Sequence, residues 1–387
     1  MIGEEECKIT YTDFYGDTRT ITLFIYAIEE VKAASGINDR MMTYTINFCS
    51  QQKLFSDQKE VKRSFANTKI STMVKEIYKS YFVTGNKDVD KKLEIEETDG
   101  EQTLVIPSLR PDAAMQFLSR RAYSSDSKSS LYTFFETRDR YYFCTPEYLV
   151  QNKGDLEGLS EEERNRLFFM YNTVDDNTGE GQIVAQQSIA GINYGTKVDT
   201  FADMKAGAYR KTVTELDIGH RTRITRTYDY TDEDEFGEAI VPVNTEQEVG
   251  HKKLKLTHSK EFIDTFMAPQ NAPETVLVTD FPQIGQNEGR DGQRKPYQHF
   301  YENYSVKPIV NYHMNTNAFT IEINGRDKLF PGDSIVLTLR KISLTLEGSP
   351  VIDRERSGMY IVLSVTNVFN EDRFRQKLTV TKGGLVA

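Results

Sequence analysis

Alternating apolar and polar residues predict β-structure in two separate parts of the chain. The first part covers residues 7–48, where runs such as CKITYT and TRTITLFIYAI flank a turn at 15–17. The second covers residues 317–384, where strand-like runs are separated by turns that include Asn324-Gly325. We therefore expect a β-meander or barrel near the start and a β-barrel or sandwich near the end.

Helical spacing follows the first of these β-rich parts. Residues 70–81 place apolar side chains at i, i+3, i+4 and i+7, with a start at Ser71 or Thr72. This predicts one amphipathic helix packed on the first barrel. A second helix is expected from about Asp112, a residue type that caps helix N-termini, and a domain boundary is expected near Pro107.

The next part of the chain is rich in aromatic residues. Two aromatic runs, 131–136 and 141–145, are joined by the short polar link 137–140, which predicts a hydrophobic hairpin. The acidic, polar stretch 151–166 is typical of a surface link with a short helix.

The pattern changes twice more before the last strands. Near Gly207 the apolar spacing of a helix or loop gives way to alternation, which predicts a change from helix to strand. Residues 232–304 are rich in Gly, Asn, Gln and Pro, so we expect long loops or an exposed insertion with only short elements.

Composition supports a β-rich protein of several domains. The 387 residues exceed the size that one hydrophobic core serves well, and 22 Phe and 21 Tyr with no Trp favour strands. The net charge of -10 argues against tight, sequence-blind DNA binding. Cys7, Cys49 and Cys144 lack the spacing of a zinc site and are expected to be reduced thiols. No apolar run is long enough to predict a membrane segment.

Motifs that carry catalysis are missing from the sequence. The five histidines lack metal-site spacing, and no GxSxG, GxGxxG, GxxxxGK[ST], HExxH or EF-hand pattern occurs. We therefore expect that the protein is not an enzyme and that it has no catalytic, cofactor-binding or metal-binding residues and no cofactor.

Four stretches, taken in order, resemble the central baseplate hub proteins of contractile phage tails, of the T-even type. They cover about two thirds of the chain, and each is a pattern of apolar residues and turns, so the resemblance lies in their combination. The four stretches are 44–82, 105–149, 206–230, and the closing strands INGRDKLFPGDSIVLTL with SGMYIVLSVTNVFNEDRFRQKLTV. Residues 1–20 and 232–304 resemble no part of such hubs.

The resemblance implies an α+β, β-rich fold with two tail-tube-like β-barrel domains, an inserted α+β hairpin domain and a loop-rich insertion. The implied domains are 1–106, the first tube-like barrel with its packed helix; 107–205, the helix and aromatic hairpin; 206–231 with 305–387, the second tube-like barrel; and 232–304, the insertion.

The resemblance also implies a function. Such a hub is a homotrimer whose six similar barrels match the six-fold tail tube and join it to the trimeric central spike protein. Its partners would be the tail tube protein or a tube initiator, the spike, the tape-measure protein and other baseplate proteins. DNA would pass through the lumen without specific binding. The chain would be assembled in the host cytoplasm and located in the tail baseplate of the virion.

Two alternatives use charged residues that the sequence singles out. A tail-associated cell-wall hydrolase would need a carboxylate pair drawn from Glu136, Asp139 and Glu147. A nucleic-acid binder would use Arg221, Arg223 and Arg226 with nearby tyrosines. Because the chain is acidic overall, cross-strand salt bridges are the favoured role for these arginines.

Overall fold

The structure is a computed structural model, and it describes most of the chain in separate stretches. The described residues are 5–13, 16–33, 42–86, 90–126, 129–153, 168–170, 188–194, 200–217, 222–229, 241–245, 248–252, 260–266, 271–279, 287–288, 294–295, 314, 318–339, 353, 356–370 and 373–381. The fold is β-rich with few helices, in agreement with the composition.

The N-terminal residues form an antiparallel meander, as their alternation predicts. It consists of β1 (Glu6–Thr12), β2 (Thr18–Ala33) and β3 (Met42–Cys49), in the order β1-β2-β3. The first turn is held by Asp13, whose Oδ1 accepts a hydrogen bond of 2.9 Å from the backbone N of Asp17. Gly16 adopts a φ of 86°, a conformation that glycine tolerates best.

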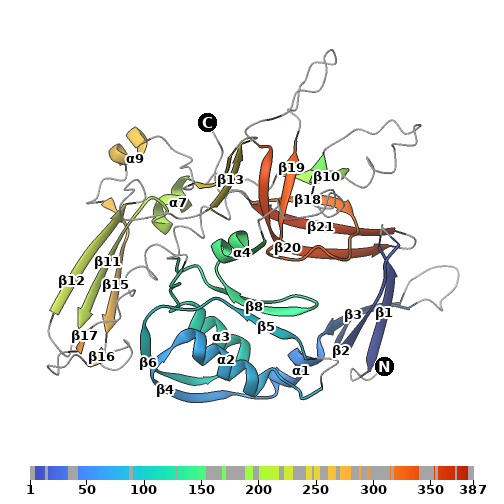
Figure 1. The fold of residues 1–387 in the computed structure, drawn as a ribbon, viewed down its shortest axis with the longest axis horizontal. Coiled ribbons are helices and arrows are strands. Elements are labelled where there is room, and N and C mark those ends of the chain that lie inside the picture. The colour runs from blue at the N-terminus through green and yellow to red at the C-terminus, as the bar shows by residue number, and fades with distance from the viewer. Residues whose placement is uncertain are drawn as a thin grey trace, which may run out of the picture.

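A compact α/β region follows the meander (Figure 1). Its elements are α1 (Gln51–Asp57), β4 (Val61–Lys69), α2 (Ile70–Tyr81), β5 (Lys92–Ile95), β6 (Glu101–Leu109), α3 (Pro111–Ser119), β7 (Thr133–Glu136), β8 (Arg140–Cys144) and α4 (Pro146–Lys153). β4 pairs with β6, and β8 lies between β5 and β7. The amphipathic helix and the aromatic hairpin are therefore confirmed, but α2 packs against β4, β5 and α3 and not, as predicted, on the N-terminal meander.

The first residues of both predicted helices differ from the prediction. α2 starts at Ile70, one residue before Ser71. The backbone N of Ser71 donates a hydrogen bond of 2.9 Å to Oγ1 of Thr98, so a side chain from a distant part of the chain caps the helix N-terminus. Asp112 is not the N-cap of α3. That position belongs to Arg110, because Pro111 fits the first helical position with its fixed φ, and Asp112 lies in the first turn.

The core of this region combines α2, α3 and the aromatic hairpin. Met73, Val74 and Ile77 of α2 are fully buried. The ring of Phe82 lies 5.5 Å from that of Tyr141 in an edge arrangement, which is favourable for aromatic pairs. Side chains from both sides of the predicted boundary at residues 106 and 107 contribute to this core. The domain boundaries themselves stay predictions.

The C-terminal strands form a six-stranded sheet that is curled into a half-barrel (Figure 1). Its order is β10-β18-β21-β20-β19-β9, from β9 (Phe168–Met170), β10 (Ile189–Asn193), β18 (Phe319–Asn324), β19 (Ser334–Thr338), β20 (Gly358–Asn370) and β21 (Arg373–Thr381). The strands predicted near the end of the chain are thus confirmed. The arrangement as two closed barrels stays a prediction.

A separate three-stranded sheet contains the basic strand that the sequence singled out. β11 (Arg210–Asp217) follows α7 (Thr200–Ala206), which confirms the change from helix to strand near Gly207. β11 pairs with β12 (Thr222–Asp229) and, in parallel, with β15 (Glu274–Thr279). β15 comes from the predicted loop-rich insertion, which also contains β13 (Val241–Thr245), β14 (Glu248–Lys252), α9 (Lys260–Phe266), β16 (Asn287–Glu288) and β17 (Arg294–Lys295).

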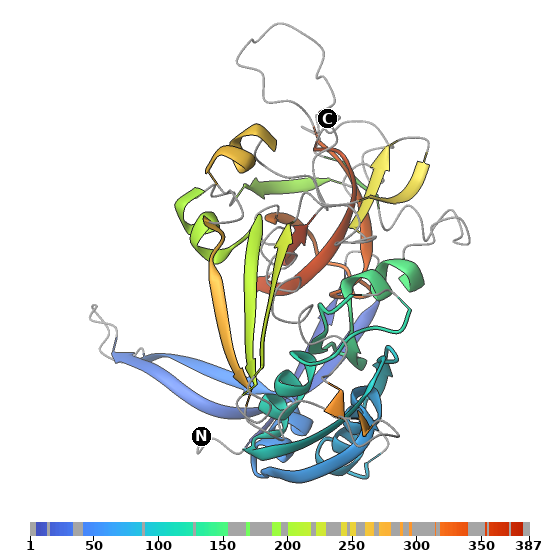
Figure 2. The same cartoon turned by 90° about the vertical axis from the view of Figure 1, so that its left-hand side faces the viewer.

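The N-terminal meander and the sheet of β11, β12 and β15 lie at opposite ends of the longest axis of the molecule. Figure 1 shows β1, β2 and β3 on the right and β11, β12 and β15 on the left, with the α/β region between them. The half-barrel lies above the α/β region. Figure 2 shows the ribbon of β2 and β3 extending away from the rest of the chain.

Candidate functional site

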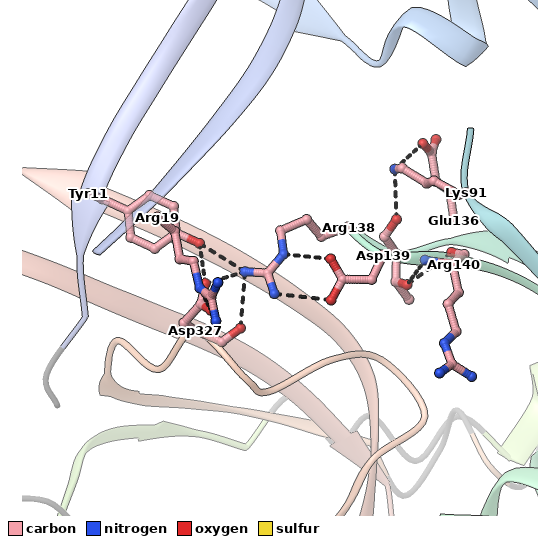
Figure 3. Close-up of polar contacts among 9 residues, drawn as sticks. Tyr11, Arg19, Lys91, Glu136, Arg138, Asp139, Arg140 and Asp327 are labelled. Atoms are coloured by element: carbon pink, nitrogen blue, oxygen red, sulfur yellow. Dashed lines mark hydrogen bonds and ion pairs between the residues drawn. The ribbon is translucent and has the colours of Figure 1, made fainter. Parts of the chain in front are cut away.

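A buried junction holds three distant parts of the chain together. The turn between β18 and β19 places Asp327 against the N-terminal meander and against the hairpin of β7 and β8 (Figure 3). The side chain of Asp327 has no solvent exposure. It accepts hydrogen bonds from Tyr11 Oη at 2.7 Å, from Arg19 Nε at 2.7 Å and from the guanidinium of Arg138. One carboxylate therefore ties three sheets together.

Further hydrogen bonds orient the groups at this junction. The backbone N of Asp327 donates to Asp13 Oδ2 at 3.1 Å. Arg138 also donates through Nε and Nη2 to Asp139, at 2.9 and 3.1 Å. Two parallel bonds from one guanidinium fix its plane, so Arg138 is held between a buried carboxylate and an exposed one.

The junction shifts the pKa values of its members. Burial opposes ionisation of Asp327, but the hydrogen bond from Tyr11 and the charge of Arg138 outweigh it, so its pKa lies below the ordinary value. Burial, followed by the hydrogen bond to Asp327, raises the pKa of the Tyr11 hydroxyl. The hydrogen bond from Arg138 lowers the pKa of Asp139. The charged form of the junction is therefore the stable one at neutral pH.

An aromatic cluster supports the junction from the side of the half-barrel. The ring of Tyr11 lies 4.9 Å from that of Phe369 and 5.1 Å from that of Phe374, and the latter two stack at 4.6 Å. Gly325 lies directly beside Phe374. A Cβ atom on Gly325 would come within 2.2 Å of that ring.

Replacing Gly325 by alanine is therefore expected to lower the free energy of unfolding by about 2 kcal/mol, as overpacking does. The new methyl group must displace Phe374 and with it the ring stack under Tyr11. Chemical denaturation measures this loss. Gly191→Ala is the matched control, because its Cβ would meet only Glu322 Cβ at 3.9 Å, an ordinary contact. Equal stability of the two variants would contradict the close packing at Gly325.

A cleft of ≈ 1260 Å³ lies beside the junction and is lined by both polar and apolar residues. Most of its charged groups pair with one another. Lys91 Nζ lies 2.5 Å from Glu136 Oε1, and Lys8 Nζ lies 3.0 Å from Glu6 Oε1. Arg19 and Arg138 both contact Asp327. The lining therefore offers few unneutralised charges with which to select an anion or a cation.

The three carboxylates of the hydrolase alternative lie in three different environments. Glu136 is bound to Lys91, and Asp139 is bound to Arg138. Glu147 is only 2% exposed, in the first turn of α4, and burial raises its pKa to about 7. A glycosidase needs two carboxylates that both reach the substrate, and Glu147 is closed off from solvent. The arrangement does not favour this chemistry.

The three arginines of the nucleic-acid alternative are only partly described. Arg221 lies outside the described residues. Arg223 forms an ion pair of 3.6 Å with Glu274 on β15, the cross-strand salt bridge that the sequence favoured. Arg226 is exposed on β12 and opposite Val213 in the register.

The sequence did not reveal the junction at Asp327. The segment INGRDKLFPGD predicts a turn, and nothing in its local pattern indicates that Asp327 would be buried. Tyr11 and Arg19 fit the alternation of strands, in which one face is expected to be polar. The one local signal in the sequence is Gly325, two residues before Asp327 in a turn between apolar strands. A glycine there allows another segment of the chain to pack closely against the turn.

The described residues show no sign of a metal site or a membrane span. Among them, no group of three or more His, Cys, Asp or Glu side chains could hold a metal ion. No helix in the described stretches is both long and apolar enough to cross a membrane. Cys7, Cys49 and Cys144 form no disulfide in the structure.

Three solved structures are similar to this chain. The tail protein from Neisseria meningitidis MC58 has a TM-score of 0.50 at 9% identity, over 99% of this chain and 89% of that one. The 43 kDa tail protein of prophage MuSo2 from Shewanella oneidensis has a TM-score of 0.45 at 9% identity, over 98% and 89%. The E. coli c3393 protein has a TM-score of 0.37 at 8% identity, over 95% and 63%.

The E. coli c3393 protein is described as a component of the type VI secretion system with structural similarity to T4 bacteriophage tail proteins gp27 and gp5. At such low identity, the likeness to the Neisseria protein shows a shared fold. No protein-family model matches the chain. No curated protein matches its sequence.

Proposed function

We propose that this chain is a structural component of a phage tail or of a related injection machine, and that it is a baseplate hub without enzymatic activity. The observation that carries the proposal is the fold that it shares with the Neisseria tail protein over 99% of its length. The order of its sequence segments, which resembles that of contractile-tail hubs, supports the same role.

Two hairpins of the same design support the expectation of two tube-like domains. In β1 and β2, the hydroxyl groups of Thr10 and Thr20 lie 2.9 Å apart. In β11 and β12, those of Thr212 and Thr227 lie 3.0 Å apart. Each hairpin has a second threonine pair two positions further along, Thr12 with Thr18 and Thr214 with Thr225.

A hub that forms a channel needs such repeated elements. In the proposed homotrimer, three chains with two similar hairpin sheets each would supply six equivalent parts toward the six-fold tail tube. The opposite side would bind the trimeric spike. A net charge of -10 suits a lumen through which the tape-measure protein and DNA pass without being held.

Electron microscopy of the purified full-length chain tests this proposal. We expect ring-shaped particles with three-fold symmetry and a central opening, because exposed sheet edges at both ends of the long axis of the molecule favour association. Mass photometry of the same sample should give three times the mass of the chain. A sample that stays monomeric at all concentrations would count against the hub.

A further inference from the structure

The β12 end of the molecule presents a basic edge that the contacts within the chain do not fully cover. Ile224 is 41% exposed, and the side chain of Arg223 is 66% exposed despite its pairing with Glu274. Arg226 is exposed as well, and it shares a face of the strand with Ile224 because side chains alternate. This edge therefore combines apolar surface with positive charge.

The ribbon of β2 and β3 presents the complementary combination at the opposite end. Tyr26 is 57% exposed and Tyr44 is 45% exposed. Glu29 and Glu30 are exposed on the same ribbon, and Glu29 pairs with Thr45 of β3 in the register. This ribbon combines aromatic surface with negative charge.

Both surfaces also include the edge of a sheet. Within the described residues, β12 and β3 are outer strands, in the orders β12-β11-β15 and β1-β2-β3. An outer strand exposes backbone N–H and C=O groups that can pair with another strand. Exposed aromatic and aliphatic side chains next to such an edge mark an interaction surface.

We infer that β12 of one copy of this chain docks on the ribbon of β2 and β3 of the next copy. The two surfaces belong to one chain, but they lie at opposite ends of its longest axis, so they cannot meet within one molecule (Figure 1). Two different, complementary patches give a head-to-tail contact, which forms a ring when the rotation between successive copies closes. The inference rests on the proposed function and names the surfaces that would build the ring.

Charge is the reason for assigning a second copy to the basic edge. A chain with a net charge of -10 is repelled by phosphates, so a nucleic acid is a poor partner. The acidic ribbon offers two carboxylates and two tyrosines, which match arginine in ion pairs and in contacts with aromatic faces. The same chain thus supplies both halves of the contact.

A charge exchange between the two ends tests the inference. Arg226→Glu and Glu29→Arg, each alone, are expected to weaken ring formation by about tenfold or more, because each places like charges opposite one another. The double variant R226E/E29R is expected to restore ring formation toward that of the natural chain. Mass photometry over a range of concentrations measures the fraction of rings.

Two controls separate this effect from misfolding and from a change in net charge. Circular dichroism should show the same unfolding midpoint for all variants, since both residues are exposed. Lys79→Glu changes an exposed residue of α2, which lies between the two ends, and is expected to leave the rings intact.

The outcomes distinguish the inference from the proposed function. If the natural chain forms no rings, the proposed hub fails, and with it the inference. If the natural chain forms rings that R226E and E29R leave unchanged, the inference is overturned and the hub stands. If the single variants lose the rings and the double variant does not recover them, the two residues do not face each other and the inference is overturned as well.

Discussion

Replacing Asp327 by asparagine is expected to lower the free energy of unfolding by about 3 kcal/mol, since removal of one partner of a buried ion pair leaves the other charges uncompensated. The value is taken from the lower end of the usual range because the side chain of Arg19 is 46% exposed and remains hydrated. Denaturation in urea at pH 7 measures the loss.

The matched control is Asp139→Asn, because Asp139 contacts the same guanidinium of Arg138 from the solvent side. The side chain of Asp139 is 56% exposed, so its loss should change the stability by less than about 1 kcal/mol. Limited proteolysis should also show that D327N releases the N-terminal meander, whereas D139N should not. Equal effects of the two variants would show that burial at the junction is unimportant.

The effect of Asp327→Asn should depend on pH. The pKa of Asp327 is lowered in the folded state, so the folded chain binds fewer protons than the unfolded chain in acid. The stability contributed by its charge is therefore complete above the ordinary pKa of an aspartate, about 3.9, and is lost as the pH falls through the folded-state pKa. The difference between natural chain and D327N should be constant from pH 6 to 8 and should shrink in acid.

The free energy of unfolding of the natural chain is expected to fall as the pH rises, because of Glu147. Glu147→Gln is expected to abolish this pH dependence. Burial raises the pKa of Glu147 to about 7, so between about pH 4.5 and 7 the folded state holds a proton that the unfolded state releases. Stability therefore falls with rising pH, by about 3 kcal/mol in total at pH 8. Glutamine does not titrate, so this slope should be absent from the variant.

Unfolding free energies at pH 5, 6, 7 and 8 test this prediction. Glu97→Gln is the matched control from the same region: hydrogen bonds from Lys75 and Ser71 lower the pKa of Glu97, so its contribution changes only in acid. The E97Q variant should keep the slope of the natural chain between pH 5 and 8. If the unfolding free energy of E147Q fell with rising pH as steeply as that of the natural chain, a group other than Glu147 would be responsible for the pH dependence.

The elements that the sequence determined by itself are those with a strong local period. Residues 70–81 repeat apolar side chains at helical spacing, and α2 occupies those residues. The aromatic hairpin has two aromatic runs joined by a short polar link, the C-terminal strands alternate at a period of two, and the structure confirms both. Such patterns suffice because one face of each element is buried regardless of what covers it.

Contacts between distant segments set where the helices begin and which strands join the sheets. Thr98 satisfies the N-terminus of α2 from another part of the chain, so no capping residue is needed at the helix itself. β15 pairs in parallel with β11 across about 60 residues, from a segment for which the sequence predicts long loops or an exposed insertion with only short elements. Two parallel strands are joined by a long crossover and not by a short hairpin turn, so no local turn pattern in the sequence identifies the strand that pairs with β11.

The junction at Asp327 belongs entirely to the tertiary structure. Its hydrogen bonds join residues that are 316 positions apart, Tyr11 and Asp327, and 189 positions apart, Arg138 and Asp327. An aspartate in a turn is ordinarily exposed, and only the approach of three sheets makes it the buried partner of two arginines. Local periodicity thus determined the strands and helices, whereas burial and charge pairing between distant segments decided how those elements are held together.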